Sequence, residues 1–257
     1  MSLEWIRNFL WPVLVPFSFL WAGATFLRRR VFRWSRRSPS IPTICFGNVH
    51  DGGTGKTPLV LACVERFAGR DLVVVSRGYR GAASGTVSVV DPTAHDAAER
   101  FGDEPVLLAS KGARVVIGRD RAAAIAFAAK QCGARWVVLD DGFQRLGVPK
   151  TFAVVVVPAD RSPWSSWCWP AGPLREPLSA IRDANAVVLT AWPDELDRLE
   201  EWETVLSELC PSVPRYRALG RVDGLSDPLS LARVDLDGSV AALCGIGAPE
   251  RFFRRVR

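Results

Sequence analysis

A glycine-rich run between an apolar segment and a helical segment constrains this chain more than any other feature. The run reads G-N-V-H-D-G-G-T-G-K-T-P over residues 47–58, and the apolar stretch 41–47 before it has the composition of a buried strand. A strand, a glycine loop and a helix in that order form a phosphate-binding loop, in which backbone N–H groups point at phosphate oxygens. The sequence therefore predicts a phosphate loop followed by a helix that begins near Thr57.

The residues of this loop have separate expected roles in binding ATP and Mg²⁺. The expected nucleotide-binding residues are Gly52, Gly53, Thr54, Gly55, Lys56 and Thr57. Lys56 would bridge the β- and γ-phosphates, and Thr57 would offer its hydroxyl to the metal. The strict pattern G-x-x-x-x-G-K-[ST] fails at one position, because His50 stands where its first glycine belongs. We expect Gly52 and Gly53 to supply the missing flexibility.

Two further acidic sites accompany the loop. Residues 136–141 read W-V-V-L-D-D, an apolar strand that ends in acids. Asp140 is the expected Mg²⁺ ligand and Asp141 has a second role at the phosphates. An acid at a strand end is also common for structural reasons, so the prediction depends on the loop beside it. At 102–105, G-D-E-P opens a helix, and on spacing alone Asp103 and Glu104 are ordinary first-turn acids.

Apolar strands and helical stretches alternate along the remainder of the chain. The expected strands are 41–47, 72–76, 87–90, 114–118, 136–140, 152–158, 186–190 and 240–245. The expected helices are 57–68, 104–110, 119–132, 193–209 and one that begins near 249. This alternation implies an α/β fold of the P-loop NTPase kind, a mostly parallel sheet with helices on both faces. We expect a core over 38–210 and the start of a smaller, incomplete region over 211–257.

The first 37 residues predict a membrane anchor that precedes this core. They are almost entirely apolar from 5 to 27, and six arginines follow between 28 and 37. A helix over 5–27 would be roughly 35 Å long, enough to cross a bilayer core, and the arginines would keep the rest of the chain in the cytoplasm. Pro12 and Pro16 would kink it. A spanning helix, an interfacial or re-entrant helix, and an apolar helix packed on the core all remain open.

The distribution of charge distinguishes lipid from nucleic acid as a partner. The net charge is +6, and the segment 1–37 alone holds seven arginines against one acid, so the remainder is balanced. A nucleic-acid-binding protein would carry its basic face on the folded domain. A basic flank beside an apolar stretch instead favours anionic lipid headgroups. The six cysteines show no C-x-x-C spacing, so we expect reduced, structural thiols and no zinc site.

Short motifs occur in a fixed order along the chain. They are the loop at 47, S-R-G-Y at 76, G-D-E-P at 102, G-R-D-R at 118, D-D-G-F-Q at 140, P-A-G-P-L-R-E-P at 170 and C-G-I-G-x-P-E-R-F-F at 244. Each motif alone is weak, but the ordered set is specific. The chain resembles the tetraacyldisaccharide 4′-kinases, the lipid A kinases, across about residues 5–253, and that family shares the imperfect phosphate loop.

The resemblance implies a reaction, a location and roles for individual residues. It implies a bacterial inner-membrane enzyme, on the cytoplasmic face, that moves the ATP γ-phosphate to the 4′-hydroxyl of a tetraacylated glucosamine disaccharide 1-phosphate. The partners would be that lipid and membrane lipids, with no obligate protein partner. Asp103 would be the general base, while Asp140 and Asp141 would serve the metal and phosphates. Candidates for phosphate handling or substrate positioning are Arg119, Arg121, Arg175 and Glu176.

Two departures from the family keep other functions open. Arg145 stands where the family usually has histidine after D-D-G-F-Q, and the chain stops at Arg257, before a family segment with an aspartate–histidine motif. A truncated, catalytically impaired nucleotide-binding membrane protein is therefore one alternative, and a partner-regulating P-loop ATPase is another. The loop 161–177 contains Trp164, Trp167 and Trp169, which would lie at the membrane interface or in the core.

Overall fold

The computed structural model describes residues 3–33, 40–67, 71–79, 81–165, 167–221, 224–226, 232–234, 241–244 and 252–254. Its strands are β1 Thr43–Gly47, β2 Leu72–Ser76, β3 Ser88–Val89, β4 Val115–Ile117, β5 Trp136–Asp140, β6 Phe152–Pro158, β7 Ala186–Ala191, β8 Arg215–Leu219, β9 Leu225–Ser226 and β10 Arg233–Val234. The α-helices are α1 Leu3–Arg33, α2 Lys56–Arg66, α3 Ala97–Phe101, α4 Asp103–Ser110, α5 Arg121–Gln131 and α6 Leu196–Leu209. Short 3₁₀ turns are η1 Ala82–Gly85, η2 Pro163–Ser165, η3 Leu178–Asp183 and η4 Pro193–Glu195.

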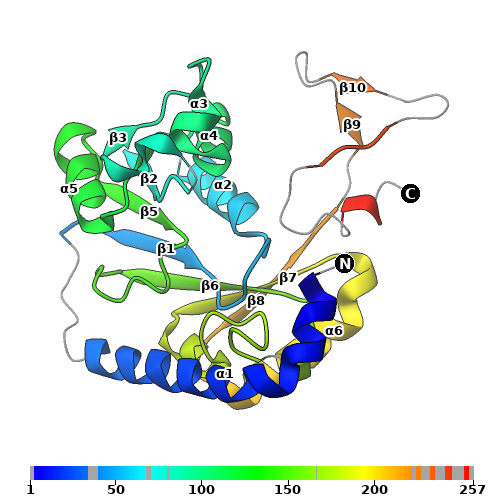
Figure 1. Ribbon diagram of the computed structural model, residues 1–257. Helices are drawn as coiled ribbons and strands as arrows, with labels where there is room; N and C mark the ends of the chain where they lie inside the picture. The colour runs from blue at the N-terminus through cyan, green and yellow to red at the C-terminus, as the bar shows by residue number, and fades with distance from the viewer. Residues whose placement is uncertain are drawn as a thin grey trace.

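The first eight strands form one sheet in the order β3-β4-β2-β5-β1-β6-β7-β8. Every neighbouring pair is parallel except β3 with β4. β1 lies between β5 and β6 at the centre, so the loop after β1 and the acids after β5 leave the sheet at the same edge. β9 and β10 form a separate antiparallel pair (Figure 1).

Helices cover both faces of the sheet, as the sequence predicts. On one face Val60 of α2 and Leu108 of α4 pack with Val74 of β2. On the other face Ile125 of α5 and Trp202 of α6 belong to a second core. Figure 1 shows α2, α3 and α4 together in the upper part of the molecule and α1 and α6 in the lower part. The runs of valine in β2, β5 and β6 are continuous because both faces of these strands are buried.

Several element boundaries differ from the expected ones. α5 begins at Arg121 because the Asp120 carboxylate accepts bonds from the N–H groups of Ala122 and Ala123 and caps the helix there. The expected helix over 193–209 consists of η4 followed by α6. Residues 241–244 form no strand, and the rest of that expected strand and the helix start near 249 lie outside the described residues. The boundary at 210 stays a prediction, although β8 beyond it pairs with β7.

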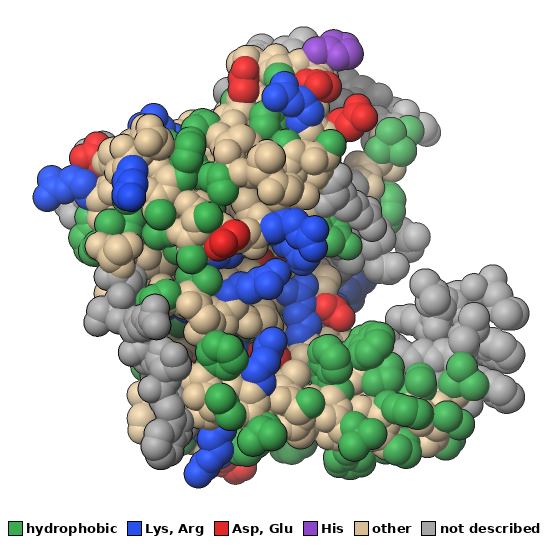
Figure 2. Space-filling view, turned by 60° about the vertical axis from the view of Figure 1, so that its left-hand side comes forward, with side chains coloured by type: hydrophobic (Ala, Val, Ile, Leu, Met, Phe, Trp, Pro, Cys, Tyr) green, Lys and Arg blue, Asp and Glu red, His purple; other side chains and the backbone are tan. Residues whose placement is uncertain are grey.

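α1 is a single helix that packs on the core along one side and exposes apolar side chains on the other. It continues through Pro12 and Pro16. The exposed apolar residues of α1 include Leu10, Trp11, Val13, Phe17, Phe19, Leu20, Phe26, Leu27, Val31 and Phe32. Figure 2 shows hydrophobic side chains gathered along the lower edge of the molecule, over α1. Residues 10–32 have a mean hydropathy of 1.6 and are long enough to cross a membrane.

The segment 167–176 joins α1 to the core. The Ser18 hydroxyl, buried within the helix, donates to the Cys168 carbonyl at 2.7 Å and accepts from the Ala171 N–H at 2.9 Å. The Trp21 indole N–H donates to the Arg175 carbonyl at 2.8 Å. Trp167 packs edge-on against two aromatic rings of α1, whereas Trp164 and Trp169 are exposed. Trp169 nevertheless lies with its ring centroid 5.5 Å from that of Trp21, so Trp167 and Trp169 both contact α1, and the expected place of these tryptophans at a membrane interface stays a prediction.

Candidate active site

The phosphate loop leaves β1 at Gly47 and enters α2 at Lys56, as the sequence predicts. Gly52 and Gly55 have φ angles of 87° and 82°, in the left-handed region that side chains disfavour. Lys56 begins α2, so the loop ends at the positive end of a helix. The local geometry therefore matches a backbone cradle for phosphate oxygens.

Buried polar contacts hold the loop in shape from inside. Thr54 is 1% exposed, and its hydroxyl accepts a bond from the Asn48 side-chain amide at 3.0 Å. The Thr190 hydroxyl at the end of β7 donates to the Thr54 carbonyl at 3.0 Å. The Gln144 side chain donates to the Asn48 carbonyl at 2.6 Å. The loop is thus tied to β7 and to the turn that follows β5.

His50, the residue in place of the first glycine, packs into the core. Its side chain is fully buried and lies edge-on to Trp202 with ring centroids 5.5 Å apart. Burial lowers the pKa of His50 to about 3, so the ring is neutral. The backbone on either side pairs with the segment 167–176: the Asp51 N–H donates to the Pro173 carbonyl and the Arg175 N–H to the Val49 carbonyl, each at 2.8 Å. The missing glycine is therefore replaced by a residue that anchors the loop.

Asp141 lies at the centre of an ionic network beside the loop. The Arg175 guanidinium donates to both of its carboxylate oxygens, at 2.9 and 3.2 Å, and Lys56 Nζ lies 3.5 Å from Oδ1. Arg175 Nε also donates to Asp51 at 2.7 Å. Burial acts to raise the pKa of Asp141, but Lys56 and Arg175 outweigh it and the pKa is lowered. The carboxylate therefore stays ionised and holds the loop lysine.

Asp140 has the opposite environment. It is 4% exposed, and its Oδ2 accepts a bond from the Ser76 hydroxyl at 3.2 Å. Burial, and then the negative charges of Glu104 and Asp141, raise its pKa to about 6. A bound cation would relieve this unfavourable charge. The Asp140 carboxylate and the hydroxyl of half-buried Thr57 supply oxygen ligands of the kind that Mg²⁺ prefers.

No group of three or more potential metal-ligating side chains (His, Cys, Asp or Glu) occurs in the part of the chain that the structure describes. A magnesium ion held by two protein oxygens would take its other ligands from water and substrate phosphates, the arrangement usual for this ion. The residues present therefore suit a nucleotide-bound metal rather than an independent metal centre.

The other predicted site residues lie at different places around this centre. Asp103 is exposed as the first residue of α4, and Arg119 is exposed near the start of α5. Arg121 is 3% exposed and donates to the Gly118 carbonyl. Burial, followed by the charge of Arg145, lowers the pKa of Arg121 to about 10, and the acid pair acts in the other direction. Arg121 therefore lies within electrostatic reach of the acids.

Glu176 faces α1 rather than the acid pair. It is 1% exposed, and its Oε1 accepts a bond from Arg28 at 2.9 Å while Oε2 accepts two bonds from Arg29. Arg29 also reaches Asp183 at 3.2 Å. These contacts attach α1 to the core. They do not involve the acid pair, so the expected role of Glu176 in positioning the substrate stays a prediction.

Sequence reasoning did not single out several residues that support the site. Asn48, Ser76 and Gln144 lie within the ordered motifs, so the motifs themselves were the signal that could have identified them. Ser18 and Trp21 had no such signal, because they lie in an apolar helix more than a hundred residues away in sequence from their partners.

A lysine-containing phosphate loop and an acid at the end of the neighbouring strand, on a mostly parallel sheet, define the P-loop class of nucleotide-binding proteins. A family model described as Tetraacyldisaccharide-1-P 4′-kinase matches residues 10–257. The chain belongs to this family of ATP-dependent kinases.

Named relatives and a solved structure agree with this assignment. A tetraacyldisaccharide 4′-kinase of Dinoroseobacter shibae is 41% identical over 242 residues, which cover 93% of this chain and 68% of the relative. The enzyme of the same name from Rhodospirillum centenum is also 41% identical, over 96% and 69% of the two chains. The fold is similar to that of an Aquifex aeolicus protein of this family in complex with ATP, with a TM-score of 0.64 and 21% identity over 87% of this chain and 86% of the other.

Proposed function

We propose that this protein transfers the γ-phosphate of ATP to the 4′-hydroxyl of a tetraacylated glucosamine disaccharide 1-phosphate, a step in lipid A synthesis. The observation that carries the proposal is the contact network from Lys56 through Asp141 to Arg175, which joins the phosphate loop to the P-A-G-P-L-R-E-P motif of the family. That motif lies outside the phosphate loop and the strand-end acid that bind the nucleotide in this class, so its contact with the loop supports transfer to a family-specific acceptor.

The nucleotide is held by groups that are already in place. Backbone N–H groups of the loop and the start of α2 face the phosphates, and Lys56 neutralises the transferring group. Thr57 and Asp140 would hold Mg²⁺, which when bound neutralises charge on the phosphates. Because Asp141 pairs with Lys56 at 3.5 Å, the lysine is held at the mouth of the loop.

The acceptor hydroxyl is a poor nucleophile and requires a positioned base. Asp103 at the exposed start of α4 is our candidate, since Glu104 beside it acts electrostatically on Asp140 and so lies close to the metal ligand. Arg119, Arg121 and Arg175 are the candidates for phosphate and acceptor contacts, because guanidinium groups bind phosphate oxygens in pairs.

Attachment through α1 would bring the site to an acylated acceptor. The exposed apolar face of α1 supports membrane association, and the inner membrane's cytoplasmic face is the proposed location. A spanning α1 would carry the segment 167–176, which is bonded to it, into hydrocarbon with its backbone polar groups. We therefore favour a helix that lies in the interface with its apolar face in the bilayer.

The decisive experiment replaces Lys56 and follows transfer from γ-labelled ATP to the acceptor lipid. Lys56→Ala should abolish transfer, because the γ-phosphate loses the cation of the loop. Lys130→Ala, an exposed lysine in the last turn of α5, is the matched control and should keep full activity. Transfer by Lys56→Ala at the rate of the control would rule out the proposed site.

A further inference from the structure

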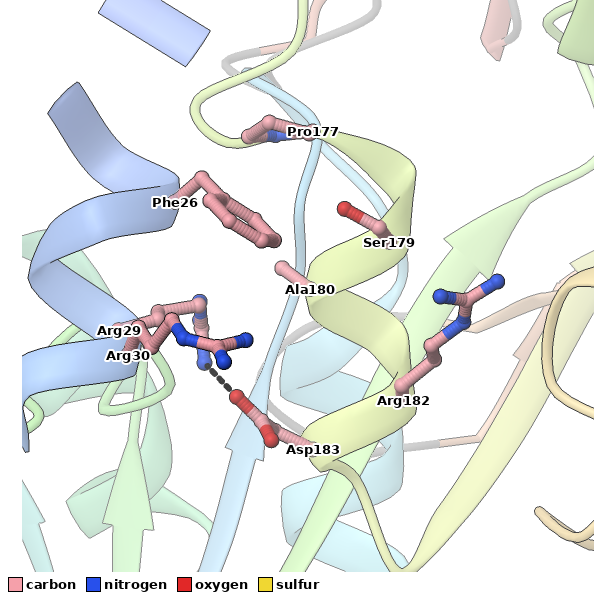
Figure 3. A pocket seen from close by; sticks show the side chains of 8 residues that line it. All are labelled: Phe26, Arg29, Arg30, Pro177, Ser179, Ala180, Arg182 and Asp183. Carbon is pink, nitrogen blue, oxygen red and sulfur yellow. Dashed lines mark hydrogen bonds and ion pairs between the residues drawn. The ribbon is translucent and has the colours of Figure 1, made fainter. Parts of the chain in front are cut away.

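A cavity of about 180 Å³ lies between α1 and η3. Its walls include Phe26, Arg29, Arg30, Pro177, Ser179 and Ala180. In Figure 3 the Phe26 ring points across the cavity toward Ala180. The side chains of Arg29 and Arg30 extend from α1 toward Asp183 on η3. One part of the cavity is therefore apolar and another is cationic.

Arg30 supplies a positive charge that its surroundings leave unbalanced. Arg29 already pairs with the carboxylates of Glu176 and Asp183, and Arg28 also pairs with Glu176. Arg30 is exposed and has no ion pair with any residue that the structure describes. The lining of the cavity contains Arg29, Arg30 and Arg182 against one acid, Asp183, so its net charge is positive and favours an anion.

The cavity lies beside the membrane-facing side of α1. Leu27 and Val31, within one helical turn of Arg30, are 61% and 62% exposed. Residues three apart are neighbours on a helix surface. An anion bound by Arg30 could therefore belong to a molecule whose apolar part contacts Leu27 and Phe26, which is the arrangement of a lipid headgroup at an interface.

We propose that this cavity binds the phosphate group of a lipid, with Arg30 and the Ser179 hydroxyl as polar contacts and Phe26 against the apolar part of the ligand. Arginine suits this role because its guanidinium can donate two parallel bonds to a phosphate. The bound phosphate group would lie beside the phosphoryl-transfer site and not in it. Pro177 follows Arg175 by two residues, so their Cα atoms are at most about 8 Å apart.

Two lipids carry the required phosphate. One is an anionic phospholipid of the bilayer, and the other is the acceptor, whose 1-phosphate is remote from the 4′-hydroxyl. Only binding of the acceptor rests on the proposed function. The experiment therefore has a vesicle-binding part, which needs no catalysis, and a phosphoryl-transfer part, which does.

Three variants of the full chain distinguish binding in the cavity from non-specific attraction between basic side chains and anionic lipid. Arg30→Gln removes the unbalanced charge. Ser179→Leu fills the cavity and leaves every charge in place. Arg66→Gln, at an exposed arginine of α2, removes one charge away from α1 and is the matched control.

The first part measures flotation with phosphatidylcholine vesicles, with and without added phosphatidylglycerol. If bilayer phospholipid is the ligand, Arg30→Gln and Ser179→Leu each lose about fivefold in affinity for the anionic vesicles, the worth of one arginine at such a surface. Binding to phosphatidylcholine alone and the behaviour of Arg66→Gln should not change. A loss in Arg30→Gln without one in Ser179→Leu would indicate diffuse attraction and contradict a phospholipid site.

The second part measures transfer in neutral detergent micelles to acceptors with and without the 1-phosphate. If the acceptor is the ligand, both cavity variants raise the KM for the phosphorylated acceptor at least about fivefold. They should leave kcat, the KM for MgATP and the KM for the other acceptor unchanged. An inactive wild type would refute the proposed function while leaving the vesicle measurement to decide the site. If Ser179→Leu behaved as wild type both in vesicle flotation and in the KM for the phosphorylated acceptor, the proposed phosphate site would be wrong. If the wild type is inactive, flotation alone decides.

Discussion

At the scale of single residues, two adjacent carboxylates at the end of β5 have opposite environments. Asp141 has a lowered pKa because Lys56 and Arg175 overcome the effect of burial. Asp140 has a pKa raised to about 6, because burial and nearby negative charge act together. A buried carboxylate without a cation costs stability in the free protein, and this cost supports our proposal that Asp140 is a metal ligand.

The acid pair makes a prediction about stability and pH. The folded-state pKa of Asp140 is raised, so its ionisation destabilises the fold above about pH 6 and has no effect below the unfolded pKa, near 3.8. Asp140→Asn should therefore raise the free energy of unfolding by on the order of 3 kcal/mol at about pH 8 and change it little at about pH 4. Urea unfolding in detergent and chelator, without nucleotide, measures this.

Asp141→Asn provides the comparison of opposite sign. The lowered folded-state pKa of Asp141 contributes stability that is present above its unfolded pKa and is lost as the pH falls through the folded value. Asp141→Asn should thus destabilise the protein at about pH 8, and the difference should shrink in acid. If both variants changed stability in the same direction at about pH 8, the two assigned environments would be wrong.

Asp103 makes a kinetic prediction. Asp103→Asn should lower single-turnover transfer at saturating MgATP by about 10²–10⁴-fold, the usual contribution of a general base, while nucleotide affinity stays unchanged. Asparagine has the size of aspartate and removes only its charge interaction with the helix dipole, about 0.3–1 kcal/mol, so α4 should remain intact. Transfer rates equal to wild type would remove Asp103 from the mechanism.

At the scale of elements, α1 is bonded to the segment that braces the phosphate loop. Ser18 and Trp21 hold the segment 167–176, and the same segment pairs with the loop through Pro173 and Arg175. Deletion of residues 1–37 would remove these bonds together with Arg28 and Arg29, the ion-pair partners of Glu176. We therefore expect that deletion to destabilise the segment 167–176 and the phosphate loop as well as to weaken membrane binding.

Removal of the Ser18 hydroxyl tests whether α1 positions the phosphate loop through the segment 167–176. Ser18→Ala leaves the Ala171 N–H and the Cys168 carbonyl without their partner, so we expect a loss of about 1–3 kcal/mol in unfolding free energy and a higher KM for MgATP. Ser18→Thr keeps the hydroxyl and should restore both. Leu20→Ala, at a residue that is 69% exposed on the same helix, is the control for MgATP binding. An unchanged KM in Ser18→Ala would show that α1 does not position the loop.

At the scale of the whole molecule, the apolar face of α1 and the phosphate loop between β1 and α2 occupy separate regions of the structure (Figure 1). The mostly parallel sheet brings the loop, the acids and the bracing segment to one edge, while α1 lies in the lower part of the molecule. The protein can therefore bind a membrane through α1 while its nucleotide site remains accessible.

Charged substitutions on α1 test this orientation without disturbing its packing. Val13, Leu20 and Leu27 are 60%, 69% and 61% exposed. Replacement of all three by glutamate should reduce vesicle binding more than about tenfold, because each loses a contribution of roughly 1.5 kcal/mol or more from apolar burial. Unfolding free energy and MgATP affinity should not change. Tyr216→Glu on β8, 59% exposed, should bind vesicles as wild type does, and equal binding by both variants would refute the orientation.

The fold class, the phosphate loop and the acid pair could be predicted from the sequence, because each depends on neighbours in the chain. Valine runs, loop glycines and a strand ending in Asp140 express local preferences of the backbone and local burial. The tertiary structure alone decided that His50 would pack against Trp202, that Glu176 would face α1, and that Ser18 would bond to Cys168, 150 residues away. These contacts join segments that are far apart in the chain, and the local sequence of one segment does not indicate its partner. The contacts stabilise the protein only after the folded sheet has brought the two segments together.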